Sequence, residues 1–184
     1  KELLSILKKL SPYAKKHGVF VIRIESELDR RHKPSLERHG LKPARSIIPN
    51  PSTITLDISA DADELLMSLP QKGRHAIRRA ERDGVSVSAV KATDKNCRIM
   101  YGLLADTAKG QFGIRPYRYY RSFWRRFEKA DQGQLFFAKV GSTVVAGAYA
   151  MVLGKKSTYK DGASLRERPT YGASHLLQWQ VIQW

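Results

Sequence analysis

Residues 71–82 (QKGRHAIRRAER) hold the side chains best suited to binding an anion, namely Lys72, Arg74, Arg78, Arg79 and Arg82. Arg74, Arg78 and Arg82 recur at every fourth position, so a helix would place them on one face. Like charges at this spacing repel each other by about 0.2–0.5 kcal/mol per pair, and a phosphate backbone would relieve that repulsion. We therefore predict a polyanion-binding helix. The alternative is a solvated face whose side-chain stems cover apolar neighbours.

A second cluster, residues 114–127 (IRPYRYYRSFWRRF), mixes basic and aromatic side chains. Arg115 precedes Pro116, which restricts it to an extended backbone and places it at a loop-to-helix junction. There its guanidinium can fork onto a phosphate or a carboxylate. The alternative is that it caps a carbonyl or pairs with an acid such as Asp106. The helix that follows is predicted to have a core side and a basic side. The core side carries Tyr120, Phe123, Trp124 and Phe127, and the basic side carries Arg118, Arg121 and Arg125.

Other reactive residue types are scarce or unsuitably spaced. The five histidines, at positions 17, 32, 39, 75 and 175, have no metal-ligand spacing, so we predict no metal site. Cys97 is the only cysteine and is expected to be a small core residue. No G-x-S-x-G motif indicates a hydrolase. We expect neither a covalent nucleophile nor a cofactor.

The overall charge supports the anion-binding interpretation. Lys and Arg total 33 against 17 Asp and Glu, and the formal net charge of +16 favours capture of a polyanionic partner. The longest apolar run, residues 144–153, is shorter than the roughly 20 residues that span a bilayer. No signal peptide is recognised at the start of the chain, and we expect a cytoplasmic protein.

Hydrophobic periodicity and turn residues predict the order of the elements. We expect a helix over 1–16, a strand over 19–25, and a short helix and linker within the proline-rich stretch 26–52. The second half is predicted to contain a strand at 53–58, two helices ending at Gly84, a strand at 85–90, helices at 94–109 and 117–130, three antiparallel strands to residue 161, and a last helix from Gly172. Both ends interrupt a helical pattern, so we expect further sequence on either side.

From residue 53 onward, this order is that of the GNAT acyltransferase fold, in the mixed α/β (α+β) class. We predict one unit over residues 1–45, a linker over 46–52 and a second unit over 53–184. A GNAT enzyme that uses acetyl-CoA needs a glycine-rich R/Q-x-x-G-x-G/A turn, whose backbone N–H groups hold the pyrophosphate. Residues 166–175 (RERPTYGASH) offer one glycine and an intervening proline, which argues against acetyl-CoA as donor.

Three segments together resemble the FemABX family of tRNA-dependent aminoacyltransferases. They are PQKGRHAIRRAERDGVSV (70–87), DTAKGQFGIRPYRYY (106–120), and YKDGAS (159–164) with YGASHLLQWQVIQW (171–184). The resemblance implies two GNAT-like domains around a cleft: the end of the first over 1–45, and most of the second over 53–184, truncated at its C-terminus. It also implies transfer of an amino acid from aminoacyl-tRNA to the stem-peptide amine of lipid II or UDP-MurNAc-pentapeptide.

The same resemblance suggests roles for individual residues. Arg115 would contact the phosphates of the precursor, Tyr119 would line the cleft, and Tyr159 would precede the Gly-Ala-Ser turn. Asp161 departs from the family's aromatic or small residue at that position. The family's catalytic Lys would lie beyond Trp184, so no catalytic residue is named. Peripheral association with the inner face of the plasma membrane through lipid II is a further expectation. The predicted tRNA contacts are Lys72, Arg74, Arg78, Arg79 and Arg82.

Two other functions remain open at this point. One is a GNAT-type N-acyltransferase with another acyl donor, which an intact pyrophosphate turn would favour. The other is a non-catalytic RNA-binding module, which would display stacking aromatic side chains on an exposed sheet. The sequence leaves open which amino acid is transferred and which amine receives it.

Overall fold

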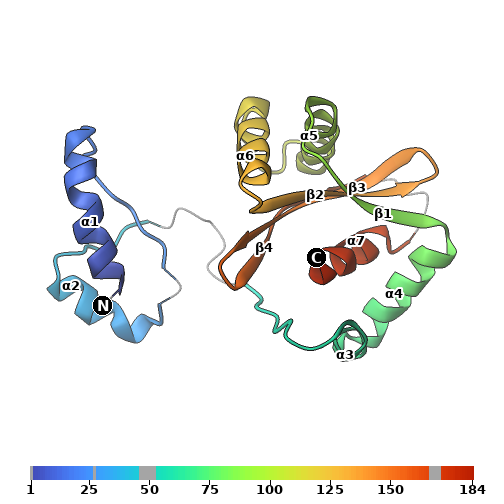
Figure 1. The fold of residues 1–184 in the computed structure, drawn as a ribbon, viewed down its shortest axis with the longest axis horizontal. Helices are drawn as coiled ribbons and strands as arrows, with labels where there is room; N and C mark the ends of the chain where they lie inside the picture. The colour runs from blue at the N-terminus through green and yellow to red at the C-terminus, as the bar shows by residue number, and fades with distance from the viewer. Residues whose placement is uncertain (1, 27, 46–52, 166–170) are drawn as a thin grey trace. The chain divides into compact units, whose positions relative to one another are not determined.

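The computed structural model describes residues 2–26, 28–45, 53–165 and 171–184 (Figure 1). The chain divides into two compact units, Lys1–Leu56 and Asp57–Trp184. The expected linker at 46–52 lies outside the described residues, as do residues 166–170 of the expected pyrophosphate turn.

The first unit contains short helices and extended segments. Its elements are α1 (Glu2–Lys16), the 3₁₀ helix η1 (Arg30–His32) and α2 (Lys33–Arg38). Gly18 ends α1 as predicted, with a left-handed backbone (φ 66°) and its N–H bonded to the Lys15 carbonyl at 3.1 Å. The predicted strand at 19–25 is wrong. Those residues are mostly exposed and form no strand, because no described segment supplies a ladder of backbone hydrogen bonds beside them.

The described part of the second unit consists of five helices around four strands. The helices are α3 (Ala62–Ser68), α4 (Gln71–Arg82), α5 (Asp94–Ala108), α6 (Tyr117–Lys129) and α7 (Ala173–Gln183). The strands are β1 (Val85–Val90), β2 (Gly133–Val140), β3 (Thr143–Leu153) and β4 (Lys156–Ser164). The order predicted from residue 61 onward is confirmed. The predicted strand at 53–58 is wrong, because its apolar residues find no sheet to cover and Ile54 is 88% exposed.

The sheet has the order β1-β2-β3-β4, and every neighbouring pair is antiparallel. The expectation of a mixed sheet is therefore wrong for the described strands. The pair α5–α6 returns the chain beside β1 in the opposite direction, and Gly141 and Gly154 turn it back twice more with left-handed backbones. β4 is consequently an edge strand of this sheet.

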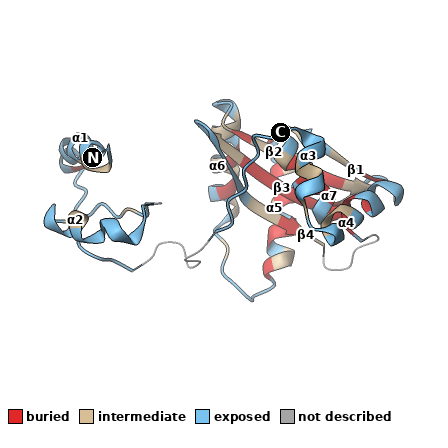
Figure 2. Cartoon of the chain, turned by 90° about the horizontal axis from the view of Figure 1, so that it is seen from below, coloured by how far each residue is buried: buried red, intermediate tan, exposed pale blue. Residues whose placement is uncertain are grey.

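Helices cover both faces of the sheet, so the strands are buried from two sides (Figures 1 and 2). On one face α4 and α7 pack over Ala146, Ala148 and Ala150 of β3. On the other, α5 and α6 pack over larger side chains, including Leu135 and Tyr149. Alternation along β3 thus places small residues under one helical layer and bulkier residues under the other.

The contact between α4 and α7 requires a glycine at position 172. Gly172 precedes α7 with a left-handed backbone (φ 90°), and a Cβ there would overlap the carbonyl oxygen of Ala76 on α4. A side chain at this position would therefore strain the backbone and also push the two helices apart.

We predict that Gly172→Ala lowers the free energy of unfolding by at least about 2 kcal/mol, combining left-handed strain and overlap. Urea denaturation followed by circular dichroism measures the change. Gly73→Ala is the matched control, because a Cβ there meets nothing within 4 Å and Gly73 lies inside α4. The control should be neutral or should stabilise by up to about 1 kcal/mol. Equal stability of Gly172→Ala and the parent chain would contradict the prediction.

Candidate functional site

α6 begins directly after Arg115 and Pro116, as predicted. Pro116 has extended backbone angles (φ −60°, ψ 151°), and the helix opens at Tyr117. The hydroxyl of Tyr101, on α5, donates to the backbone carbonyl of Arg115 at 3.3 Å and so fixes this segment against α5. The guanidinium of Arg115 lies over the Tyr119 ring, 5.0 Å from its centroid. The structure therefore brings these two predicted substrate-binding side chains together, and both are exposed.

The guanidinium of Arg115 is not neutralised by the acid considered for it. Asp106 pairs instead with Lys109, at 3.0 Å. Among the described residues, no carboxylate forms a salt bridge with Arg115. Contact with a ring occupies the flat face of a guanidinium and leaves its N–H edge available for hydrogen bonds. Arg115 is thus placed to receive an anion.

A row of aromatic rings connects Tyr119 to strand β4. Tyr119 stacks on Phe123 with ring centroids 6.0 Å apart, and the ammonium of Lys160 lies 5.3 Å from the centroid of Phe123. Behind this row, Tyr120 and Trp124 are buried, which confirms the predicted core side of the helix. Two cations, Arg115 before α6 and Lys160 on β4, therefore lie over aromatic rings of α6.

Asp161 anchors α6 to β4 from beneath. Its carboxylate accepts a hydrogen bond from the indole N–H of Trp124 at 2.9 Å and pairs with Lys160 at 3.1 Å. The Asp161 side chain is only 9% exposed, so these partners offset the cost of burying a charge. From the sequence, Asp161 was identified only as a departure from the FemABX pattern, and its role in holding α6 was not predicted.

A bulge in β4 separates Tyr159 from Asp161. Tyr149 pairs with Asp161 and Ala150 pairs with Tyr159, so Lys160 is the extra residue. In a regular strand, residues 159 and 161 would point to the same face. The bulge instead lets Asp161 contact Trp124 of α6 and Tyr159 contact Gln178 of α7.

Tyr159 lines a small cavity at the edge of the sheet. The cavity has a volume of about 190 Å³ and is also lined by Thr107, Gly162, Ala163, Ser164, Ser174 and Leu177. The hydroxyl of Tyr159 forms a hydrogen bond with Gln178 on α7, and burial is the main cause that raises the pKa of Tyr159. A Cβ at Gly162 would overlap the Tyr159 ring, so this position needs a glycine. Tyr159 thus belongs to a pocket separate from the Arg115–Tyr119 pair.

The predicted tRNA-binding cations on α4 are partly used by the fold. Arg74 donates to the carbonyl of Met67 at 3.0 Å and also to that of Leu69, so it caps the end of α3. Arg79 pairs with Asp83 at 3.6 Å and lies over the Tyr171 ring. The remaining three are exposed on the helix surface: Lys72, Arg78 and Arg82.

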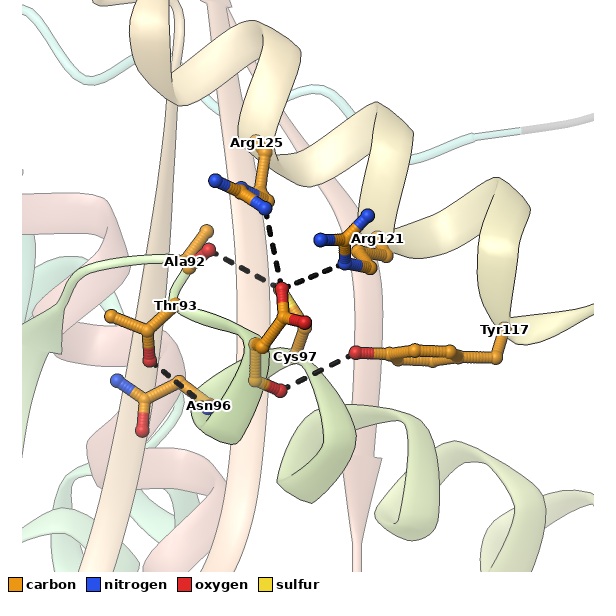
Figure 3. A network of polar contacts seen from close by, with 8 residues as sticks. Ala92, Thr93, Asn96, Cys97, Tyr117, Arg121 and Arg125 are labelled. Atoms are coloured by element: carbon orange, nitrogen blue, oxygen red, sulfur yellow. Dashed lines mark hydrogen bonds and ion pairs between the residues drawn. The ribbon is translucent and has the colours of Figure 1, made fainter.

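One polar network on α6 was not foreseen from the sequence (Figure 3). A carboxylate oxygen of Asp94, at the start of α5, accepts from Arg121 at 2.7 Å and from Arg125 at 3.2 Å. The hydrogen bond from Arg121 is the main cause that lowers the pKa of Asp94. The Tyr117 hydroxyl donates to the Asp94 backbone carbonyl at 3.3 Å. The only sequence signal was the spacing of Arg121 and Arg125, which places both on the side of α6 away from its aromatic core.

The described residues lack two features that would indicate particular classes of protein. They contain no group of three or more His, Cys, Asp and Glu side chains that could hold a metal ion. None of the helices in this part of the chain has the length and apolar character to cross a membrane.

Comparison with known proteins gives a family and a fold. Residues 71–184 match the sequence profile described as Acetyltransferase (GNAT) domain. The chain superposes on the crystal structure of FemX with a TM-score of 0.74 and 16% sequence identity, covering 98% of this chain and 64% of FemX. The C-terminal domain (DUF2156) of a proposed lysylphosphatidylglycerol synthetase from Agrobacterium fabrum aligns with a TM-score of 0.42 and 17% identity, over 64% of this chain and 40% of that chain. No protein of curated function matches the sequence.

These findings confirm the predicted fold class, a mixed α/β fold of the GNAT type resembling that of FemX. At 16% identity the likeness to FemX concerns the fold alone, and the chain spans less than two thirds of the length of FemX. The matched profile covers more than half of the chain. The chain therefore belongs to the GNAT acetyltransferase-domain family, with a FemX-like fold.

Proposed function

We propose that this chain is part of an aminoacyltransferase that moves an amino acid from aminoacyl-tRNA to the stem-peptide amine of a peptidoglycan precursor. The acceptor would be lipid II or UDP-MurNAc-pentapeptide. The family and the FemX-like fold support acyl transfer. The observation that carries the choice of acceptor is the exposed Arg115 guanidinium, held over Tyr119 at the start of α6 and free of a carboxylate partner among the described residues. Such a group suits the diphosphate that both precursors contain.

The reaction requires little covalent chemistry from the protein. An aminoacyl ester is already activated: the acceptor nitrogen bonds to the ester carbon, the bond to the tRNA ribose oxygen breaks, and the amine proton leaves with that oxygen or to water. Orientation of the amine and stabilisation of the oxyanion are then the main contributions. Burial raises the pKa of Cys97 to about 11, so this thiol stays protonated and is no nucleophile.

One candidate subsite would bind the acceptor, and the other would lie near the transferred group. Arg115 and Tyr119 would hold the phosphates and the adjoining part of the precursor. The cavity beside Tyr159, which has hydroxyl groups from Thr107, Ser164 and Ser174 in its lining, suits a small polar group near the transfer point. Binding of lipid II would bring the protein to the inner face of the plasma membrane.

Transfer of label tests the proposal directly. The protein is incubated with aminoacyl-tRNAs carrying radiolabelled amino acids and with each precursor, and the precursor is separated and counted. Acetyl-CoA is offered as donor in a parallel reaction. Label on the stem-peptide amine from aminoacyl-tRNA supports the proposal. Transfer only from acetyl-CoA would favour the other class of GNAT N-acyltransferase instead.

We predict that Arg115→Ala raises the KM for the precursor, with a loss of about 2 kcal/mol, typical of a charge-assisted contact. Arg115→Lys should raise KM less, because it retains the charge but loses the guanidinium fork. Steady-state kinetics at saturating aminoacyl-tRNA measures both.

Arg118→Ala is the matched control, because it removes an equal charge from an exposed position in the first turn of α6, three residues from Arg115. It should leave the KM for the precursor within about two-fold, the range of surface substitutions. Affinity for aminoacyl-tRNA should change in neither Arg115 variant. Wild-type KM in both Arg115 variants would refute the assignment of Arg115.

The cations of α4 are proposed to contact tRNA, and the structure divides them into two groups for testing. Arg78→Glu and Arg82→Glu should weaken tRNA binding several-fold each and flatten the salt dependence by about 1 per lost phosphate contact. Arg74→Ala should instead lower the melting temperature, because it removes the cap of α3. A salt dependence that is unchanged in the Arg78 and Arg82 variants would remove α4 from the tRNA-binding surface.

A further inference from the structure

An open groove of about 870 Å³ runs along the basic side of α6, on the helix that carries Tyr119 at its start. We call it the α6 groove. Its lining contains two acidic side chains and five basic ones: Lys91, Arg121, Arg125, Arg126 and Lys129. The neighbouring ends of β1 and β2 form its other wall, through Lys91 and Gln134. The groove thus joins cations from separate segments of the chain on one concave surface.

The acids near the α6 groove leave several of its cations without a partner. The Glu128 carboxylate accepts a hydrogen bond from the backbone N–H of Ala92 at 2.6 Å, and therefore serves to hold α6 beside the end of β1. In the described part of the chain, no salt bridge is found for Lys91, Arg126 or Lys129. The groove therefore keeps a positive potential that this unit does not neutralise by itself.

Two guanidinium groups of the groove are held in place before any ligand arrives. Asp94 binds both Arg121 and Arg125 through one carboxylate oxygen, which restrains these long side chains (Figure 3). Arg125 uses only its Nη1 atom for this contact, which leaves other N–H groups for an acceptor. Restraining a cation beforehand reduces the entropy that is lost when it binds an anion.

The spacing of the cations indicates a ligand with several phosphates. Arg121, Arg125 and Lys129 recur every fourth residue, so they extend over about 12 Å of helix at a rise of roughly 1.5 Å per residue. A single phosphate cannot bridge that length, whereas a polynucleotide backbone offers phosphates in series. A membrane surface fits less well. All of the lining residues are polar or charged, whereas helices that bind membranes combine basic residues with apolar side chains that insert.

We propose that the α6 groove binds the phosphate backbone of RNA and supplies a larger share of RNA affinity than α4 does. That this RNA is tRNA rests on the proposed function. The two helices cover opposite faces of the sheet, so they offer distinct surfaces. On α4, Arg74 is committed to capping α3 and Arg79 to Asp83 and Tyr171. Each surface keeps three described cations that form neither a salt bridge nor a helix cap, but the α6 groove gathers its three on one concave surface. It also adds Arg125, which uses only one nitrogen for Asp94.

The test measures binding of fluorescently labelled, deacylated tRNA to the 184-residue chain by anisotropy, between 50 and 200 mM salt. The test variant combines Arg126→Glu with Lys129→Glu, which leaves the Asp94 contacts intact. We expect its affinity to fall at least about ten-fold at 150 mM salt and its salt dependence to flatten by about 2. Arg78→Glu with Arg82→Glu should cause a smaller loss.

Two controls separate a specific contact from total charge and from misfolding. Lys8→Glu with Lys9→Glu makes the same change in net charge as the test variant, at two exposed positions of α1. It should weaken binding by less than about three-fold. Arg126→Lys with Lys129→Arg keeps both charges and should retain affinity. Melting followed by circular dichroism should be the same for all variants, because the altered side chains are exposed.

Several results would overturn the proposal. One is an equal loss of RNA affinity in the α6 and α1 variants, and another is a larger loss in the α4 variant. A third is an α6 variant that keeps RNA affinity but no longer binds phosphatidylglycerol vesicles, which would assign the groove to membrane binding. The proposed function fails separately. Groove-dependent RNA binding without amino-acid transfer refutes the function alone, and normal transfer with normal RNA binding by the α6 variant refutes the groove alone.

Discussion

The hydrogen bond from Trp124 to Asp161 determines where α6 lies on the sheet. The indole is fully buried, and the carboxylate that accepts from it is almost so. A buried carboxylate that loses a partner costs several kcal/mol, so α6 cannot slide along β4 without a large penalty. The Tyr149 hydroxyl donates to the Trp124 carbonyl at 2.7 Å and locks the same turn of the helix from below. Arg115 at one end of α6 and the α6 groove farther along it are both placed by this anchor.

The bulge at Lys160 relates the Trp124–Asp161 anchor to the cavity beside Tyr159. Because one extra residue separates Tyr159 from Asp161, β4 can hold α6 through the Asp161 carboxylate. The same strand can line the cavity next to α7 through the phenol of Tyr159. A regular strand would turn both side chains to one face and lose either the anchor or the pocket. The bulge also places the ammonium of Lys160 over Phe123, next to Tyr119. A single backbone irregularity therefore organises both candidate subsites.

Most of the second unit could be predicted from local sequence signals, because its helices and strands have strong periodicity and defined ends. Residues 85–90 alternate, and Thr93 caps the next helix through the N–H of Asn96, so β1 and α5 form where expected. The segments predicted as strands at 19–25 and 53–58 have similar patterns, but no described part of the chain pairs with them. Pairing is a property of distant segments, which an alternating pattern cannot report.

The candidate site was predictable where a residue acts through its local backbone, and not where its role depends on a distant partner. Pro116 directly follows Arg115, and this local rule alone predicted that Arg115 lies just before the helix. The bond between Trp124 and Asp161 joins residues 37 positions apart, and the bulge at Lys160 depends on how β4 pairs with β3. No spacing rule indicates either. The same holds for Asp94, the first residue of α5. Its contact with two arginines of the next helix was not predictable.

The two basic helices show why charge spacing alone does not identify an anion-binding surface. Both α4 and α6 carry cations at every fourth residue, and the prediction from the sequence placed the tRNA contacts on α4. In the folded chain, the guanidinium of Arg74 is turned back to cap α3, whereas Arg121 and Arg125 share Asp94 and remain at the surface. An arginine whose N–H groups already satisfy backbone carbonyls contributes less to a ligand than one held by a single carboxylate oxygen. The distribution of hydrogen-bond donors, more than the number of positive charges, therefore favours α6.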